Sequence, residues 1–134
     1  MNLENIFKRT ILIYALSEII AIVFQLTLEG RIIGEEYVKI NSDLPSFYGD
    51  SFFLPPLALV VLIVHFFSLY LLYKFKPIGK QIYVYSLVII IIFLLLFFHD
   101  ISSGPMYAID LIGTILSGII LSFLYFTPIK DKFK

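Results

Sequence analysis

The sequence contains no cysteine and no tryptophan, and only 15% of its 134 residues are charged. The absence of cysteine excludes disulfide bonds, thiol redox chemistry and thiolate metal sites. The shortage of charge, together with 60% hydrophobic residues and a mean hydropathy of +0.96, leaves too little polar surface to cover a water-soluble domain. The composition therefore predicts an integral membrane protein, with the lipid bilayer as its first partner.

The sequence signatures of common enzymes are also missing. There is no GxSxG, HExxH, phosphate-binding loop, dinucleotide-binding fingerprint or Cys-x-x-Cys motif. We therefore expect a protein that is not an enzyme, with no catalytic residue, no metal site and no cofactor. We also expect no nucleic-acid partner.

Four long apolar segments alternate with polar ones. A helix needs about 20 apolar residues to cross a bilayer, and four segments come close to this length: residues 10–28, 52–73, 82–98 and 107–126. We expect a single transmembrane domain over residues 1–134, folded as an all-α four-helix bundle. Ser103 is expected to cap the fourth helix. The outer loop, residues 29–51, has apolar side chains at helical spacing, which favours a short interfacial helix on the membrane surface.

The cations predict the orientation of the chain in the membrane. With four crossings, eight of the ten Lys and Arg residues fall on one side: Lys8, Arg9, Lys74, Lys76, Lys80, Lys130, Lys132 and Lys134. Because basic residues are enriched on the cytoplasmic side, we expect both termini to be cytoplasmic (N-in/C-in). The predicted location is a bacterial inner (cell) membrane, with the acidic loop 29–51 facing outward.

The most informative residue is Glu18, near the middle of the first span. A charged side chain at the bilayer centre costs roughly 2.5–3.5 kcal/mol, so Glu18 should be neutral, paired or turned toward other helices. His65 is eight residues from the end of the second span, and Glu18 is eight residues from the start of the first. We hypothesise that Glu18 and His65 face each other as an intramembrane polar pair. Alternatively, each is neutral and bonds a backbone carbonyl.

Other residues are expected to support this pair. Tyr14, Ser17 and Gln25 lie on or beside the Glu18 face of the first helix. The fourth span carries small residues that allow close helix packing: Gly113, Thr114, Ser117, Gly118 and Ser122. Among these, Gly118 is expected to lie beside Glu18. The third span is apolar all round and is expected at the periphery, with Tyr83 near its start as an interface anchor.

A small polar cluster is predicted at the outer surface, where His99, Asp100 and Asp110 lie within a short stretch. A histidine with two carboxylates could bind a divalent cation. However, the spacing matches no known metal motif. We interpret the three residues as a solvated, capped helix junction.

Two resemblances bear on function. The whole chain, with its central basic turn and its ending FLYFTPIKDKF, resembles a group of uncharacterised small bacterial four-span membrane proteins. This similarity implies a fold but no activity. The segment ALSEIIAIVFQLTLEG resembles the first helix of the small multidrug resistance exporters, which places Glu18 at the position of their proton-binding acid. The chain departs from these exporters in its long outer loop and its lack of tryptophan.

The leading functional hypothesis is a non-enzymatic membrane protein that acts as an accessory, assembly or immunity-type factor. Its partners would be lipids, another membrane protein or a second copy in a homodimer, because the acidic outer loop and the small-residue fourth helix suit protein contact. The alternative is a proton-coupled small-molecule exporter that uses Glu18 as the proton carrier.

Overall fold

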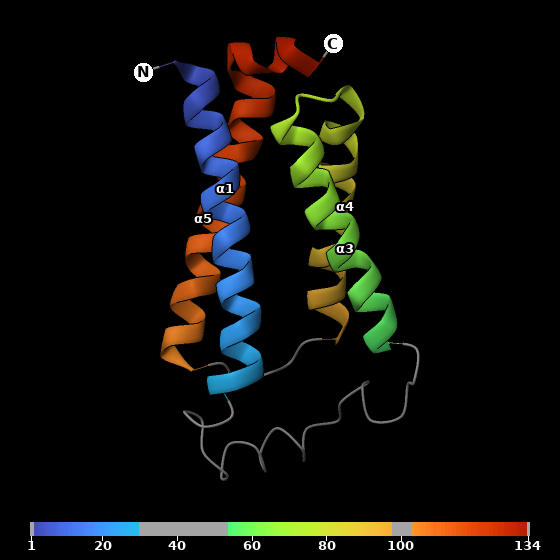
Figure 1. Cartoon of the computed structure of the whole chain (residues 1–134). Coiled ribbons are helices and arrows are strands. Elements are labelled where there is room, and N and C mark those ends of the chain that lie inside the picture. Colours follow the sequence, from blue (N-terminus) through green and yellow to red (C-terminus); the bar gives the residue numbers. More distant parts are fainter. Residues whose placement is uncertain (1, 30–53, 98–102, 134) are drawn as a thin grey trace.

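The computed structural model describes residues 2–29, 54–97 and 103–133, and within these ranges the chain is helical and contains no strand (Figure 1). The helices have the following bounds: α1, Leu3–Phe24; the π-helical turn η1, Gln25–Glu29; α3, Leu54–Tyr73; α4, Pro77–Phe97; α5, Gly104–Phe126; and the 3₁₀ helix η2, Pro128–Phe133. The predicted surface helix in loop 29–51, as well as His99 and Asp100, lie outside the described residues.

Among the described residues, three helical stretches are long and apolar enough to cross a membrane: Leu3–Leu28, Pro56–Tyr73 and Gly104–Phe126. The described apolar part of α4 is shorter and covers Pro77–Ile92. The described part of the chain is therefore all-helical, with several helices of membrane-spanning length, as the composition predicts.

The helices begin where capping residues allow, rather than where the hydropathy rises. The Asn2 side chain accepts a hydrogen bond from the Glu4 backbone N–H at 3.2 Å, so α1 starts at Leu3, seven residues before the predicted span. Similarly, α4 starts at Pro77, because proline suits the first helical turn. The predicted cap of α5 is present, since the Ser103 hydroxyl accepts the Met106 N–H at 3.3 Å.

Two pairs of helices make the main contacts: α1 packs along α5, and α3 packs along α4, with further contact between α1 and α3 (Figure 1). The α3–α4 turn is tight and places Phe75 in the left-handed region, at φ 53°. Gly79 lets α4 approach α3 closely, because a Cβ at this position would lie 2.8 Å from the Leu71 Cβ. Both chain ends and this turn lie at the same end of the molecule (Figure 1).

An aromatic cluster fastens this end of the molecule. The fully buried Phe7 ring lies 5.7 Å from the ring of Phe75, 5.5 Å from that of Phe123 and 6.0 Å from that of Phe133. These four rings belong to α1, the α3–α4 turn, α5 and η2. A Lys132–Glu4 ion pair of 2.9 Å adds a surface contact between η2 and α1. The two helix pairs are therefore joined at the end that carries both termini.

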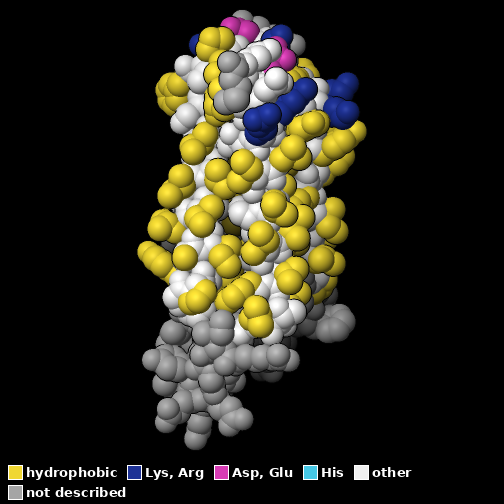
Figure 2. Space-filling model, turned by 60° about the vertical axis from the view of Figure 1, so that its left-hand side comes forward, with side chains coloured by type: hydrophobic (Ala, Val, Ile, Leu, Met, Phe, Trp, Pro, Cys, Tyr) yellow, Lys and Arg dark blue, Asp and Glu magenta, His cyan; other side chains and the backbone are white. Residues whose placement is uncertain are grey.

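The outer flanks of the molecule are apolar. Figure 2 shows hydrophobic side chains along the helices and a concentration of Lys and Arg near one end. Four apolar residues of α1 are about half exposed: Leu12, Ile19, Ile20 and Val23, at 56%, 49%, 48% and 53%. Because exposed apolar surface on this scale is costly in water, it fits a lipid environment.

The prediction that the third span lies at the periphery is wrong for the first half of α4. Gly79, Tyr83 and Ser86 are buried there, at spacings of four and three residues, on one face of the helix. The prediction was based on the uninterrupted apolar run later in the span and did not take this small and polar face into account. Beyond it, Val88 and Ile91 are exposed, as expected for a lipid-facing surface.

Candidate functional site

The buried imidazole of His65 connects three helices. Its side chain on α3 is 1% exposed; Nε2 lies 3.1 Å from the Tyr14 hydroxyl on α1, and Nδ1 lies 2.9 Å from the Ser86 hydroxyl on α4. The Ser86 hydroxyl donates its single hydrogen to the Tyr83 carbonyl at 2.8 Å. Ser86 must therefore accept from Nδ1–H, which leaves Nε2 to accept from Tyr14. One neutral tautomer satisfies every partner.

The sequence places His65 on the inner face of α3. Ser68, Leu69 and Leu72 follow it at spacings of three, four and seven residues, and all are buried. The Ser68 hydroxyl donates to the His65 carbonyl at 2.6 Å, so it needs no partner on another helix. The imidazole is buried, so its hydrogen bonds are not exposed to competition from water.

Tyr14 stands between the two residues of the predicted pair. The Tyr14 ring meets the His65 ring edge-on, with centroids 5.7 Å apart, and its hydroxyl interacts with the Glu18 carboxyl group. No direct hydrogen bond joins Glu18 to His65, because both ring nitrogens are occupied by other partners. The predicted direct contact is therefore replaced by an indirect one. Tyr14 lies one turn before Glu18, and its longer side chain reaches the imidazole.

Glu18 is half-buried and lies against α5 at Gly113. A Cβ built on Gly113 would be 3.0 Å from Glu18 Oε1, so this glycine leaves the space that the carboxyl group occupies. The prediction that Gly118 lies beside Glu18 is wrong, because a Cβ on Gly118 meets nothing within 4 Å. The predicted register aligned residue 10 with residue 126. In the structure Phe7 packs on Phe123 instead. Glu18 lies eleven residues after Phe7, and Gly113 lies ten residues before Phe123. This register places Glu18 level with Gly113.

Tyr83 completes the polar site from the α4 side. Its ring is fully buried, lies 5.6 Å from the His65 ring, and interacts electrostatically with Glu18. Its hydroxyl has no hydrogen-bond partner among the described residues. A buried polar group left unpaired costs about 1–3 kcal/mol. A further polar partner for the Tyr83 hydroxyl would therefore be stabilising.

The two remaining predicted residues of the first span, Ser17 and Gln25, contribute no side-chain hydrogen bond to another helix within the described part of the chain. The Ser17 hydroxyl is close to the site but donates to the Tyr14 carbonyl at 2.8 Å. Gln25 is exposed in η1 and is not brought to the site. Tyr83 and Ser86 were missed by sequence reasoning, although their spacing from Gly79 was a usable signal.

On α5, Gly113 is the one member of the predicted small residues that is buried, and it lies against α1. Thr114, Gly118 and Ser122 are exposed, and both hydroxyls bond to their own helix: Thr114 to the Asp110 carbonyl at 2.9 Å and Ser122 to the Gly118 carbonyl at 3.0 Å. The Ser117 hydroxyl also bonds within the helix, to the Thr114 carbonyl at 2.8 Å. This exposed stripe is therefore available to lipid or to a partner.

The predicted outer cluster is only partly described, since Asp110 alone of its three members lies in the described ranges, where it is exposed. Within the described ranges, no group of three His, Asp or Glu side chains could hold a metal ion.

The polar site around His65 can hold helices together and exchange protons along its hydrogen bonds. Comparison with known proteins adds no assignment: no family model matches the chain, and neither a curated protein nor a solved structure matches it.

Proposed function

We propose that this chain is a non-enzymatic, four-span integral membrane protein that acts by binding another component of the membrane, as an accessory, assembly or immunity-type factor. The tight turn between α3 and α4 supports a fourth crossing, since α4 runs back along α3 (Figure 1). The clustering of Lys and Arg at the end with both termini supports a cytoplasmic location for that end.

The observation that carries this proposal is that both nitrogens of His65 are used between helices. Tyr14 and Ser86 occupy them, and the hydrogen of Ser86 is in turn used by a backbone carbonyl. These buried polar groups therefore hold α1, α3 and α4 together. The surfaces left for recognition are the outer helix faces, which are apolar or carry small residues with satisfied hydroxyls.

Site-specific photo-crosslinking in native membranes tests this proposal. A photoreactive amino acid is placed at one exposed position on each of three helices: Leu12 on α1, Ile63 on α3 and Ile119 on α5. A binding protein presents a defined partner on one face. We therefore expect one discrete adduct, with a protein or a single lipid class, at one of the three positions.

The two other positions serve as matched controls, because all three side chains are similarly exposed and apolar, at 40–58%. Bulk lipid labelling of equal intensity at all three positions would contradict the proposal. A specific contact should be lost when a neighbouring residue on the same helix face is replaced by a larger one. An adduct that persists after such a replacement would also count against a specific contact there.

A second candidate function, proton-coupled export through Glu18, is favoured by the order of the polar groups. The Glu18 carboxyl group interacts with the Tyr14 hydroxyl, which donates to His65, which donates to Ser86. A chain of donors pointing in one direction is suited to proton movement. The Tyr83 hydroxyl, which has no hydrogen-bond partner among the described residues, interacts electrostatically with Glu18.

Proton release from purified protein distinguishes the two functions. Addition of a lipophilic cation should release protons if Glu18 exchanges a proton for substrate, and Glu18→Gln should abolish this release. Glu4→Gln is the matched control, since Glu4 is at the surface and paired with Lys132. Equal release from both variants, or none from the unmodified protein, would contradict the transport function.

A further inference from the structure

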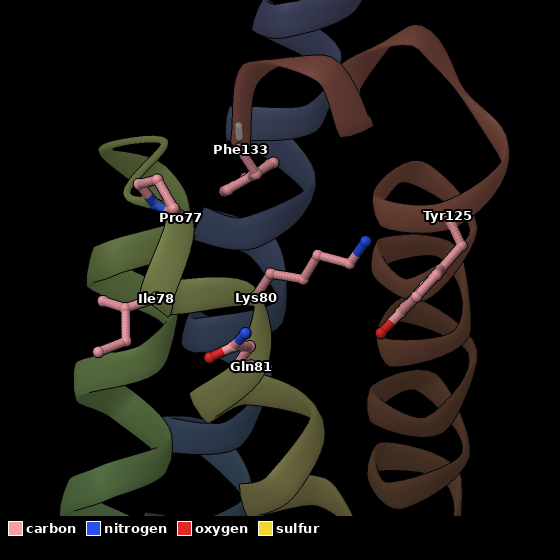
Figure 3. Close-up of a pocket in the computed structure, with 6 residues that line it drawn as sticks. All are labelled: Pro77, Ile78, Lys80, Gln81, Tyr125 and Phe133. Atoms are coloured by element: carbon pink, nitrogen blue, oxygen red, sulfur yellow. The ribbon is translucent and has the colours of Figure 1, made fainter.

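A cleft of about 610 Å³ opens at the lysine-rich end of the molecule, between α4, α5 and η2 (Figure 3). The lining residues come from all three elements: Pro77, Ile78, Lys80, Gln81, Tyr125 and Phe133. In Figure 3 the Lys80 side chain extends from α4 across the space toward Tyr125 on α5, and Phe133 covers it from η2. The cleft is open rather than enclosed.

Lys80 is held in the cleft by an aromatic ring. Its Nζ lies 4.0 Å from the centroid of the Tyr125 ring, which is a close cation–π contact. Lys80 is half-buried, whereas Lys74 and Lys76 in the preceding turn are exposed. None of the described residues lining the cleft is acidic. The cleft therefore contains a positioned positive charge that no lining carboxylate neutralises.

Further donors accompany this charge. The Tyr125 phenol and the Gln81 amide both lie below the Lys80 chain in Figure 3. Together the ammonium, the phenol and the amide place several N–H and O–H donors along the cleft. Phosphate oxygens accept charge-assisted hydrogen bonds of this kind. The remaining lining residues, Pro77, Ile78 and Phe133, are apolar and suit the adjoining carbon atoms of an amphiphile.

The surface leading away from the cleft toward the opposite end of the helices is apolar or small. On α4, Val88 and Ile91 lie on the Lys80–Gln81 side of the helix and are 48% and 53% exposed. On α5, Gly118 is seven residues before Tyr125, on the same face, and has open space beside it. An acyl chain can follow these residues while its headgroup lies in the cleft.

We propose that this cleft binds the phosphate headgroup of an anionic glycerophospholipid. The inference rests on the proposed membrane function, because it identifies a lipid partner and requires this end of the helices to lie at headgroup level. Basic pockets between helices on the cytoplasmic side are suited to such headgroups. A zwitterionic phosphocholine is disfavoured, because its own cation would have to approach Lys80.

Native mass spectrometry of the detergent-purified protein tests the site with dioctanoyl phosphatidylglycerol, with dioctanoyl phosphatidylcholine as the competing lipid. The unmodified chain should bind the anionic lipid preferentially and with a defined stoichiometry. Lys80→Gln should weaken this binding about tenfold, since it removes one charge-assisted hydrogen bond. Tyr125→Phe should weaken it less, and Lys80→Arg should retain it.

Lys76→Gln is the matched control, because it removes the same charge from an exposed position in the neighbouring turn. Equal losses in Lys76→Gln and Lys80→Gln would overturn the proposal, since general surface charge would then explain the binding. Displacement of the lipid by millimolar inorganic phosphate would also overturn it, in favour of a soluble anion. The melting temperature of each variant without lipid shows whether it has folded.

Failure of this site is distinguishable from failure of the proposed function. The crosslinking positions Leu12, Ile63 and Ile119 do not line the cleft. A discrete adduct there, with no lipid preference at Lys80, would leave the proposed function standing and reject only the headgroup site.

Discussion

Removing the Ser86 hydroxyl tests whether His65 ties the helices together. In Ser86→Ala, the imidazole loses the acceptor that lies 2.9 Å from Nδ1, in a site where the His65 side chain is 1% exposed. Interhelical hydrogen bonds in membrane proteins contribute on average only about 0.6 kcal/mol, and at most about 1.7. An unpaired buried donor, however, costs about 1–3 kcal/mol. Since Ser86→Ala leaves the His65 Nδ1–H group unpaired, we expect a destabilisation of about 1–2 kcal/mol.

The assay is reversible unfolding in mixed micelles, with the fraction of denaturing detergent as the variable. Ser122→Ala is the matched control, because the Ser122 hydroxyl is exposed and bonds only to the Gly118 carbonyl of its own helix. This variant should change the free energy of unfolding by less than about 0.5 kcal/mol. Equal free energies of unfolding for Ser86→Ala and Ser122→Ala would refute the reasoning.

A double-mutant cycle with Tyr14→Phe sharpens the result. Tyr14 and Ser86 contact opposite nitrogens of one imidazole, so the choice of tautomer couples their hydrogen bonds. We expect a coupling free energy of at least about 0.5 kcal/mol. If the two changes in the free energy of unfolding are strictly additive, the two hydrogen bonds act independently. This result would contradict a coupled network through His65.

Three further predictions concern packing and use the same unfolding assay. Gly113→Leu should destabilise the protein because its side chain would displace the Glu18 carboxyl group, whereas Gly118→Leu should be tolerated because the space beside it is open; similar losses would contradict the α1–α5 register. Gly79→Val should cost about 1–3 kcal/mol by separating α4 from α3, and an unchanged midpoint would exclude this close approach. Phe7→Ala should cost about 3–5 kcal/mol because the ring is fully buried; a loss below 1 kcal/mol would show that the aromatic cluster is not a core.

The sequence was sufficient to predict the helices, because membrane-spanning length and apolar composition are local properties. Helix caps such as Ser103 are also readable, since they depend on residues three positions apart. The register between helices was not readable. Hydropathy marks where lipid begins, whereas α1 continues through polar residues to Leu3, and this extension shifted the partner of Glu18 from Gly118 to Gly113.

The candidate site was predicted in part for a related reason. Glu18 and His65 attract attention because charged or ionisable groups are rare inside membrane spans. Ser86 and Tyr83 do not, since serine and tyrosine are common there and are easily read as packing residues or interface anchors. Only their side-by-side position on α4, facing His65, gives them a role, and this depends on how α3 and α4 pack.

The rings around Phe7 join both helix pairs at the end that holds the termini. Such a fastening constrains relative movement unequally along the length of the molecule. Any separation of the α1–α5 pair from the α3–α4 pair must be smallest beside these rings and must grow with distance from them. The half of the molecule beyond His65 is therefore where a lipid tail or a partner helix could enter with the least disruption of the packed core.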